Sequence, residues 1–573
     1  MLRLPIGYDN FYEIIHKKFD FVDKSLFIKE VFDDSAQVAL ILRPRRFGKT
    51  LNLSMLHCFL AAEVYKKSTV GLFDNLKIMD TGEEYLQHLG KYPVIFLTFK
   101  DIKSTSFTQA QEKLRELLIR TFDEHAYLAN SERLSENQRQ LFHAIYSNSA
   151  NAAQFSNALY TLTECLATHH GINPWLLIDE YDSPIQSAYM NDYYPEMIEL
   201  MRSVFSTALK TNPYLERAVI TGILRIAKED LFSGLNNLAV YSVLSSAYSQ
   251  YFGFTEAEVT NLLEQNAWQD KADDIRRWYN GYQIGKTILY NPWSMVNYFR
   301  EDGQLMPYWV NTSDNALIKR LLTHGSNQFK SDFETLLDDR VLNKPIDENM
   351  IFADLLSNTE SPWSLLLMAG YLKVVAKEFT QDAIRCDLRI PNLEVNFLYR
   401  KIIKEWLANG HCISWYNAFL EHLLNGNIPL FERELREILV EIVSSHDTAK
   451  RSENFYHGLM LGLTASLRYD PDYELYSNKE SGYGRYDYLI VSKKMDKPTL
   501  LLEFKKMDKP KNSDELEEKL EQTAQDALKQ IYTNQYAADV KQRGISNLLC
   551  LAIAFCGRDF ALASDHKLEL YSN

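Results

Sequence analysis

The sequence predicts an α/β protein that begins with a parallel sheet, continues through a mostly helical region and ends in a second α/β domain. Short apolar runs alternate with long helical stretches over residues 1–254. Residues 255–444 are mostly helical in pattern, and strand-like and helical segments alternate again over 445–573. A chain of 573 residues is too long for one hydrophobic core. We therefore expect three domains with these boundaries.

Four apolar runs are the expected strands of the first domain. They cover residues 37–42, 93–99, 174–180 and 216–224. Helical stretches separate them, the longest at 107–125, 151–169 and 191–211. Buried strands that alternate with helices imply a parallel sheet covered on both faces. This layout is typical of a nucleotide-binding domain.

The later elements follow from local signals. Thr255 and Glu258 precede an apolar periodic run and fit a capping box, which marks the start of a helix. The stretch 278–299 predicts a turn or hairpin that leads into a helix. The last domain is predicted to contain a helix at 453–467, strands at 484–491 and 499–506, a helix at 513–537 and a last strand at 547–555.

Composition narrows the class of protein. The 13% aromatic content opposes extensive disorder, and six scattered cysteines without a C-x-x-C pair suggest buried thiols in a reducing compartment. No apolar stretch is long enough to span a bilayer, and the first residues lack the apolar run of a signal peptide. We therefore expect a cytoplasmic protein that does not act in a membrane. A net charge of −14 excludes a uniformly basic surface but leaves room for a local basic cleft.

A phosphate-binding loop is predicted after the first strand. Residues 43–50 read R-P-R-R-F-G-K-T and lead into a helix. Gly48 permits close approach of the backbone to a phosphate, Lys49 is placed to contact the β- and γ-phosphates, and Thr50 is placed to bind magnesium. Arg43 stands where the common G-x-x-x-x-G-K-T pattern has its first glycine. An ordinary basic turn is the competing interpretation of this segment alone.

Two adjacent carboxylates strengthen the prediction of a nucleoside triphosphate site. Asp179 ends the apolar run 174–180, and Glu180 follows it. Carboxylates that emerge from a buried strand are costly to bury without a cation or hydrogen-bond donors. In a P-loop enzyme the first orders the magnesium shell and the second activates the attacking water. A strand end that runs into a solvated loop is the simpler alternative.

The fourth strand adds two further candidates. It ends at Thr221, and Arg225 follows a few residues later. A polar residue at this strand end is placed to sense the γ-phosphate, and Arg225 is placed to reach it. An ion pair between Arg225 and a nearby acid such as Glu229 is an equally good explanation.

The chain resembles a known family at this point. The segments R-P-R-R-F-G-K-T, LLIDEYDSPI (176–185) and TGILRIAKEDLFSGLNNL (221–238) are similar to AAA-ATPase-like proteins that carry a C-terminal PD-(D/E)XK nuclease domain. The resemblance is close over about 300 N-terminal residues and looser in the tail. It implies ATP as the nucleotide, and its members share the glycine-poor loop. It also implies a restriction-endonuclease-like fold for the last domain, and a bacterial protein of defence or DNA processing.

The resemblance also suggests roles for residues near the loop. Asp23 and Lys24 would lie at the start of the ATPase fold, near the nucleotide base. Arg45 and Arg46 would either hold phosphate or serve a neighbouring subunit. The second arrangement would require a homo-oligomer.

A second candidate site lies in the predicted hairpin of the last domain. Asp487 is in the first strand, and Glu503 and Lys505 lie two residues apart in the second, on one face. A pairing centred near residue 495 places Asp487 opposite Glu503, and one centred near 496 places it opposite Lys505. Either register gathers all three side chains on one face. Asp487 and Glu503 are then candidate magnesium ligands, and Lys505 a candidate for steering water and stabilising charge.

Two more residues extend this site. Glu453, in the preceding helix, is the best candidate for another metal ligand. Gln530, in the helix after the hairpin, is a further catalytic candidate because a helix glutamine completes the site in related nucleases. An exposed stripe of acidic and basic residues on a half-buried hairpin is the simpler alternative.

Together these patterns predict an ATPase that controls a Mg²⁺-dependent nuclease, with DNA a better fit than RNA. One alternative is a nucleotide-dependent binding switch whose nuclease-like domain is inactive. Another is a kinase-like phosphotransferase that uses the same loop.

Overall fold

The computed structural model describes residues 2–225 and 236–309 and, between short gaps, most of 321–442 and 456–567. It divides into two compact units. The first comprises Met1–Gly325 and Asp339–Asn396, and the second comprises Ser326–Asp338 and Phe397–Asn573. The first unit thus extends beyond residue 254, and the predicted boundaries of three domains stay a prediction.

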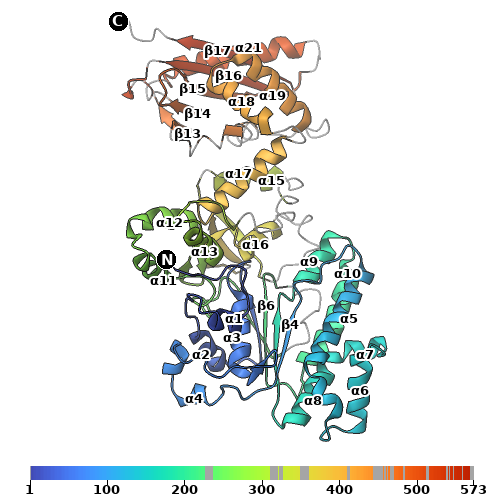
Figure 1. The fold of residues 1–573 in the computed structure, drawn as a ribbon. Helices are drawn as coiled ribbons and strands as arrows, with labels where there is room; N and C mark the ends of the chain where they lie inside the picture. Colours follow the sequence, from blue (N-terminus) through green and yellow to red (C-terminus); the bar gives the residue numbers. More distant parts are fainter. Residues whose placement is uncertain are drawn as a thin grey trace. The chain divides into compact units, whose positions relative to one another are not determined.

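A five-stranded parallel sheet forms the centre of the first unit (Figure 1). Its strand order is β4-β5-β6-β1-β7. The strands are β1 (Val38–Leu42), β4 (Val94–Thr98), β5 (Trp175–Asp179), β6 (Arg217–Gly222) and β7 (Leu238–Tyr241). The four predicted strands are therefore confirmed as β1, β4, β5 and β6, and β7 is an addition.

Strand β6 lies between β1 and β5, and this order decides which strand ends meet. Ile41 of β1 pairs with Thr221 of β6, and Ile178 of β5 pairs with Ile220 of the same strand. Asp179 and Thr221 therefore reach the same edge of the sheet, beside the loop that follows β1. The interiors of β1 and β5 are fully buried, which explains their continuous apolar sequences.

Helices cover both faces of this sheet, as the alternating pattern predicts. Figure 1 shows α1–α3 on one side and α5, α8 and α10 on the other. The helices of this part are α1 (Phe11–His16), α2 (Leu26–Asp33), α3 (Lys49–Leu60), α4 (Glu83–Leu86), α5 (Phe107–Glu124), α6 (Glu136–Tyr146), α7 (Ala152–Ser156), α8 (Ala158–His170), α9 (Ser183–Met190) and α10 (Tyr194–Leu209). A small hairpin, β2 (Glu63–Val64) with β3 (Lys67–Ser68), follows α3.

The region after residue 254 contains the predicted capped helix and hairpin. The Thr255 side chain and Glu258 form the capping box of α11 (Glu256–Gln265). Then follow α12 (Ala272–Tyr279), the hairpin β8 (Tyr282–Ile284) and β9 (Thr287–Leu289), and α13 (Pro292–Arg300).

A three-stranded antiparallel sheet is the unexpected part of this region. It has the order β10-β12-β11, with β10 (Leu342–Ile346), β11 (Lys373–Phe379) and β12 (Ile384–Arg389). Helix α16 (Ser361–Met368) precedes β11. The description of 255–444 as mostly helical omitted this sheet, because its strands carry charged residues that hide the apolar alternation.

The second unit contains a five-stranded mixed sheet with the order β13-β14-β15-β16-β17. Its strands are β13 (Tyr473–Ser481), β14 (Gly484–Ser492), β15 (Thr499–Lys506), β16 (Leu548–Cys556) and β17 (Asp559–Lys567). Its helices are α15 (Asn327–Leu337), α17 (Leu393–Ala408), which begins in the first unit, α18 (Ile413–Leu424), α19 (Ile428–Ile442) and α21 (Leu516–Thr533). Both faces of the sheet are apolar, one packed with residues of α18 and α19 and the other with α21.

One prediction for this unit needs correction, and one strand is an addition. The strand at 547–555 is not the last one, since β17 follows it, and β13 precedes the predicted hairpin. Most of the predicted helix at 453–467 lies outside the described residues. The pairing of β14 with β15 is centred on residue 495, because Tyr488 pairs with Leu502. This is the first of the two expected registers.

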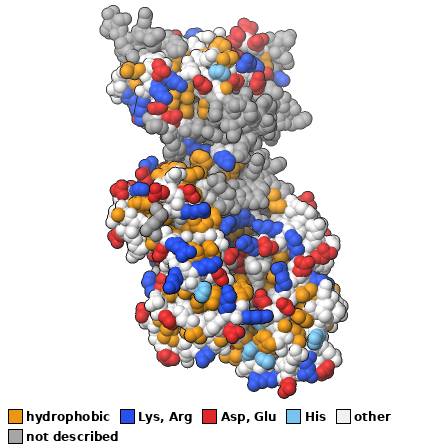
Figure 2. Space-filling model, viewed as in Figure 1, with side chains coloured by type: hydrophobic (Ala, Val, Ile, Leu, Met, Phe, Trp, Pro, Cys, Tyr) orange, Lys and Arg blue, Asp and Glu red, His pale blue; other side chains and the backbone are white. Residues whose placement is uncertain are grey.

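Acidic and basic side chains are interspersed over the described surface seen in Figure 2. The negative net charge is therefore not gathered into one acidic field on that face. Among the described helices, none combines the length and apolar character needed to cross a bilayer.

Candidate functional site

The loop between β1 and α3 has the backbone of a phosphate-binding loop. Arg46 and Gly48 adopt left-handed conformations, with φ of 66° and 82°. Glycine takes such a conformation without steric cost, whereas Arg46 is strained by it. No side chain caps the start of α3 at Gly48, so the first backbone N–H groups of this 12-residue helix face the loop without a side-chain acceptor. Such an N-terminus attracts an anion.

Lys49 is held inside this loop. Its Nζ donates to the backbone oxygens of Arg43 (3.0 Å) and Pro44 (2.9 Å). The side chain is 5% exposed, and burial lowers the pKa of the ammonium group while the carboxylates of Glu180 and Asp179 oppose that shift. An ammonium group has three donors. The two loop carbonyls therefore leave one donor for a ligand.

Asp179 joins the two threonines that the sequence singles out. Thr50 Oγ1 donates to Asp179 Oδ2, and Thr221 Oγ1 donates to Asp179 Oδ1, each at 2.7 Å. Asp179 is fully buried, and burial is the largest cause of its raised pKa. Lys49, Thr50, Asp179 and Thr221 are therefore brought together from α3 and two strand ends. A buried carboxylate next to the Thr50 hydroxyl fits the oxygen ligands that magnesium prefers.

Glu180 follows Asp179 in the chain and has an unusual backbone conformation. Its φ is 52°, in the left-handed region, and Ser183 Oγ donates to its Oε2 at 3.0 Å. Non-glycine residues in this region store strain and gather at functional sites. Unlike fully buried Asp179, Glu180 is partly exposed and lines the cavity described below. Its carboxylate is therefore accessible to a ligand or a water molecule.

Two residues that the sequence reasoning missed hold the loop after β6. Asp182 Oδ2 accepts hydrogen bonds from the backbone N–H groups of Ile223 (2.9 Å) and Leu224 (3.0 Å), and Tyr181 donates its hydroxyl to the oxygen of Leu224 at 2.5 Å. Asp182 is buried, and burial raises its pKa. The second aspartate of D-E-Y-D was the available signal, since a further carboxylate after Asp179 and Glu180 also needs donors.

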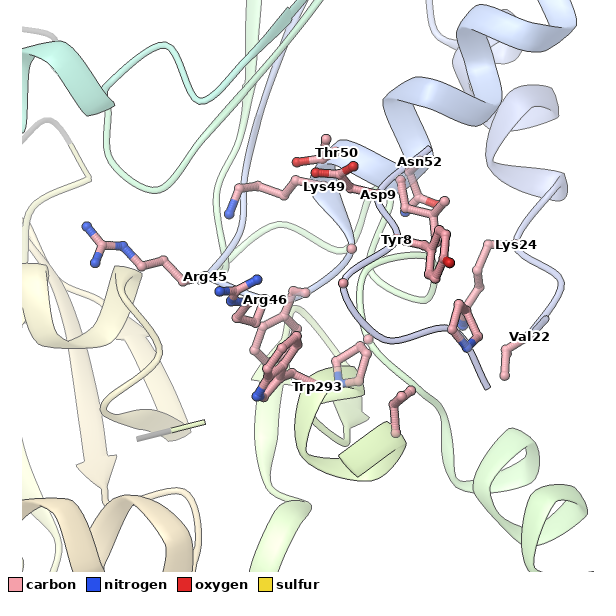
Figure 3. Close-up of a pocket in the computed structure, with 18 of the residues that line it drawn as sticks. Tyr8, Asp9, Val22, Lys24, Arg45, Arg46, Lys49, Thr50, Asn52 and Trp293 are labelled. Carbon is pink, nitrogen blue, oxygen red and sulfur yellow. The ribbon is translucent and has the colours of Figure 1, made fainter. Parts of the chain in front are cut away.

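A cavity of about 470 Å³ opens beside these groups. This volume suits a small ligand. Figure 3 shows Lys49, Thr50 and the two loop arginines toward one side, and Val22 and Lys24 toward the other. The lining includes Leu4, Pro5, Tyr8, Phe21, Val22, Lys24, Arg45, Arg46, Gly48, Lys49, Thr50, Asn52, Glu180, Asp182, Tyr251, Phe254, Pro292 and Trp293. Asp9, Asp20, Lys100 and Lys103 also line the cavity, so the lining combines charged and apolar side chains, as a nucleotide requires.

Lys24 and Asp23 have different roles. Lys24 lines the cavity, donates to Glu258 Oε2 at 2.6 Å and to the Gln250 oxygen at 2.8 Å, and burial lowers its pKa. Asp23 instead accepts from the backbone N–H groups of Ser25 and Lys77, each at 2.8 Å. Asp23 is therefore a structural residue, and only Lys24 is placed to meet a ligand.

The remaining predicted residues of this site lie in different places. Arg45 donates to Gln186 Oε1 at 2.6 Å, and the Arg46 guanidinium lies 4.4 Å from the ring centre of Trp293 (Figure 3). Arg225 is half-buried and is not among the residues that line the cavity. Its suggested partner Glu229 lies outside the described residues, so the alternatives for Arg225 stay open.

The candidate site of the second unit contains three predicted residues, Asp487 in β14 and Glu503 and Lys505 in β15. Asp487 Oδ2 accepts from the backbone N–H of Phe504 at 2.7 Å, and Lys505 Nζ lies 3.0 Å from Glu503 Oε1. Burial, followed by the nearby charge of Asp487, raises the pKa of Glu503 to about 7. Glu503 Oε2 is buried without a hydrogen-bond partner in the described part of the chain. Two close carboxylates of which one is buried and partly unpaired suit a divalent cation.

The roles of Gln530 and Glu453 at this site stay predictions. The Gln530 amide donates to the hydroxyl of Tyr536 at 3.2 Å. Glu453 lies outside the described residues. Within the described ranges, no group of three or more histidine, cysteine, aspartate or glutamate side chains is arranged to hold a metal ion.

Comparisons with known proteins agree with this architecture. Residues 5–232 match the model of the AAA-ATPase-like family, described as predicted AAA-ATPase, and residues 451–564 match the PD-(D/E)XK nuclease superfamily. The resemblance noted in the sequence is thereby confirmed for these two segments. An uncharacterized protein in the vnfD 5′ region of Azotobacter chroococcum mcd 1 is 27% identical over 502 residues, covering 85% of this chain and 87% of that protein.

A Walker-type ATPase of Pyrococcus abyssi is similar at 13% identity with a TM-score of 0.37. The match covers 70% of this chain and all of that one.

Proposed function

We propose that this chain hydrolyses ATP and uses the nucleotide cycle to control a Mg²⁺-dependent phosphodiesterase that cleaves DNA. One observation supports ATP hydrolysis. Beside a cavity lined by charged and apolar side chains lie Lys49, Thr50, Asp179 and Thr221. The second half rests on Asp487, Glu503 and Lys505 in a segment that matches a nuclease superfamily.

In the ATPase half, each residue has a task that follows from its surroundings. The N–H groups at the start of α3 and the free donor of Lys49 would bind the β- and γ-phosphates. Thr50 and Asp179 would hold a magnesium ion, which neutralises charge on the phosphates. Glu180, strained and facing the cavity, would orient the attacking water and take its proton. Thr221 links Asp179 to the loop that Asp182 fixes.

In the nuclease half, Asp487 and Glu503 would hold the metal and Lys505 would stabilise negative charge on the phosphodiester. A bound metal ion would lower the pKa of a water molecule and so supply the nucleophile. The unpaired oxygen of Glu503 supports this assignment, because a buried carboxylate without a donor is stabilised by a cation. Gln530 and Glu453 remain candidates that would complete the set.

The biological setting belongs to the same proposal. We infer a cytoplasmic bacterial protein of defence or DNA processing from the family resemblance, with DNA favoured over RNA. A homo-oligomer would be needed only if a neighbouring subunit supplied an arginine to the nucleotide.

A second candidate is a nucleotide-dependent binding switch with an inactive nuclease domain. One observation favours it: Glu503 Oε1 pairs with Lys505, and Asp487 Oδ2 accepts from the backbone of Phe504, so one oxygen of each carboxylate already has an internal partner. Such a protein would bind nucleic acid without cutting it.

Phosphate release tests the first half. The full chain with ATP and Mg²⁺ should release free phosphate without any acceptor, which also separates an ATPase from a phosphotransferase. Glu180→Gln and Lys49→Ala should lower the rate by about 100-fold or more. Lys91→Ala, which removes an exposed lysine, is the matched control and should keep the wild-type rate. A wild-type chain that binds ATP without releasing phosphate would contradict the proposal.

Cleavage of DNA and RNA in single- and double-stranded form, with and without ATP, tests the second half. Asp487→Ala and Glu503→Gln should abolish Mg²⁺- or Mn²⁺-dependent cleavage. Asp559→Ala, an exposed aspartate of β17, is the matched control. Lys49→Ala should change the ATP dependence of cleavage. If wild-type protein binds DNA and leaves it intact with both metals, the switch is the better explanation.

A further inference from the structure

Two tryptophans from outside the first sheet contact the arginine pair of the phosphate-binding loop. Trp293, in the first turn of α13, lies with its ring 4.4 Å from the Arg46 guanidinium. Trp309 donates its indole N–H to the backbone oxygen of Arg45 at 3.1 Å. Both tryptophans lie in the stretch between the two segments that match known families. The loop is therefore braced by residues that neither family model contains.

Arg46 brings a positive charge to the cavity. It lines the cavity together with Lys49 and Thr50, and no carboxylate lies within ion-pair distance of it in the part of the chain that the structure describes. An aromatic face attracts a guanidinium without accepting conventional hydrogen bonds from it, so the N–H donors, which lie in the guanidinium plane, stay available to an anion. The stacked arginine can therefore keep its place on Trp293 while its N–H groups bind phosphate oxygens.

Trp293 is itself held firmly. The Asn291 side chain caps α13, and the Trp293 indole donates to the Tyr308 oxygen at 3.3 Å. The next residue, Ser294, donates its hydroxyl to Glu394 Oε2 at 2.7 Å. Fully buried Glu394 also accepts from the backbone N–H of Trp309 at 2.7 Å. One buried carboxylate thus fixes both tryptophan-bearing segments.

We propose that Trp293 is a positioning residue that holds Arg46 at the phosphate part of the cavity, so that each subunit supplies its own arginine to the γ-phosphate of ATP. This inference rests on the proposed ATP hydrolysis. Arg46 stabilises the negative charge that develops on the transferred phosphoryl group. Figure 3 shows the two side chains together, Arg46 from the loop and Trp293 from α13. Arg45 takes part mainly through its backbone oxygen, which accepts from Trp309, because its side chain donates to Gln186.

The test is a double-mutant cycle on the full chain. Arg46→Ala should lower kcat by about 100-fold, and Trp293→Leu should lower it by about 10-fold because the arginine loses its fixed position. Trp293→Phe keeps an aromatic face and should restore most of the rate. The combined Arg46→Ala/Trp293→Leu chain should be no slower than Arg46→Ala alone, because the tryptophan acts only through the arginine.

Binding of ATP and ADP, measured by calorimetry with Mg²⁺, gives an independent readout. Arg46→Ala and Trp293→Leu should each reduce the preference for ATP over ADP several-fold, because the arginine contacts only the γ-phosphate. Tyr476→Leu is the matched control, since it removes a cation–π pair with Arg543 in the second unit and does not alter the cavity lining. It should leave the ATP preference and kcat unchanged.

Two results would overturn the positioning role. One is a combined variant that is slower than Arg46→Ala by the full factor found for Trp293→Leu alone. The other is an unchanged ATP preference in Trp293→Leu. If wild-type protein binds ATP but does not hydrolyse it, the proposed ATPase activity fails, and the ATP preference still decides whether Trp293 places Arg46.

Discussion

Arg43 shows how one residue can replace the first glycine of a phosphate-binding loop. Its guanidinium donates to the backbone oxygens of Leu42, Tyr241, Ser242 and Ala247 at 2.8–3.0 Å, and it is fully buried. Burial lowers its pKa to about 9. The common loop has a glycine at this position, which gives the backbone conformational freedom. In this loop the Arg43 side chain instead connects the end of β1 to the end of β7 and the segment after it. Arg43 is therefore part of the loop's framework.

Replacing Arg43 should destabilise the first unit. Arg43→Met removes a donor from four carbonyl groups, of which that of Ser242 keeps the backbone N–H of Ser245, and each group left unpaired costs about 1–3 kcal/mol. We expect the free energy of unfolding, measured by denaturant titration, to fall by about 3 kcal/mol or more. Arg277→Met, at an arginine whose side chain is 67% exposed, should change it by less than about 0.5 kcal/mol. Equal stabilities of the two variants would contradict the framework role.

Glu394 gives the first unit a dependence on pH. Burial raises its pKa from 4.5 to about 8, although the hydrogen bonds from Trp309 and Ser294 act in the opposite direction. Between these values the folded chain holds a proton that the unfolded chain has released. The contribution of Glu394 to stability should therefore decline as pH rises, by about 1.4 kcal/mol per pH unit.

Glu394→Gln isolates this effect, because glutamine cannot titrate. The free energy of unfolding of Glu394→Gln relative to wild type should increase from about pH 5 to about pH 8, by up to about 4 kcal/mol. Denaturant titrations of both chains at matched pH measure the difference in the free energy of unfolding. The contributions of all other titrating groups cancel in this difference. A difference that stays constant over this range would show that Glu394 is not protonated in the folded chain.

At the scale of elements, the strands that the sequence revealed are those buried on both sides. The runs that became β1, β5 and β16 are continuously apolar, and Asp179 is the last residue of β5. β13 and β17 stand at the edges of their sheet and mix polar with apolar residues, so they gave no comparable signal. Asp182 and Glu394 could not be predicted as site residues, because they bind backbone groups and residues distant in sequence. Contacts of this kind depend on the folded arrangement rather than on a local pattern.

The junction between β6 and its following loop makes a testable contact. A Cβ atom added to Gly222 would lie 2.6 Å from Cε1 of Tyr181 and 2.9 Å from Oδ1 of Asp182. Tyr181 is buried and cannot move away freely, because its hydroxyl is bound to Leu224. Gly222→Ala should therefore lower the free energy of unfolding by about 1–3 kcal/mol and slow phosphate release.

A second substitution checks the cause. Tyr181→Ala removes the ring that Gly222→Ala would meet, so the glycine change should cost much less in a Tyr181→Ala background. Denaturant titration of the two single variants and the double variant measures this coupling. If the losses of stability in the two single variants simply add up in the double variant, the contact with the Tyr181 ring is not the reason that Gly222→Ala is destabilising.

For the whole molecule, the sequence located both candidate sites but not the connection between the two units. The phosphate loop and the β14–β15 hairpin were predictable because their residues are close in sequence or at aligned strand ends. Helix α17 begins in the first unit, where Glu394 joins the tryptophans that contact the loop, and continues in the second unit from Phe397 onward. The chain crosses between the units three times, after residues 325, 338 and 396, and α17 is the crossing that contains Glu394.

A break in α17 should separate the two proposed activities. Lys401 is exposed in this helix, and Lys401→Pro removes a backbone donor and clashes with the preceding turn at a cost of about 3 kcal/mol. We expect phosphate release and metal-dependent cleavage each to stay within about twofold of wild type, while ATP no longer alters cleavage. Lys401→Ala preserves the helix and should keep the ATP dependence. Cleavage assays with and without ATP, run beside phosphate release, measure both effects. A proline variant with full ATP dependence would show that the nucleotide acts on cleavage by a route other than α17, because a broken helix transmits no displacement from Glu394.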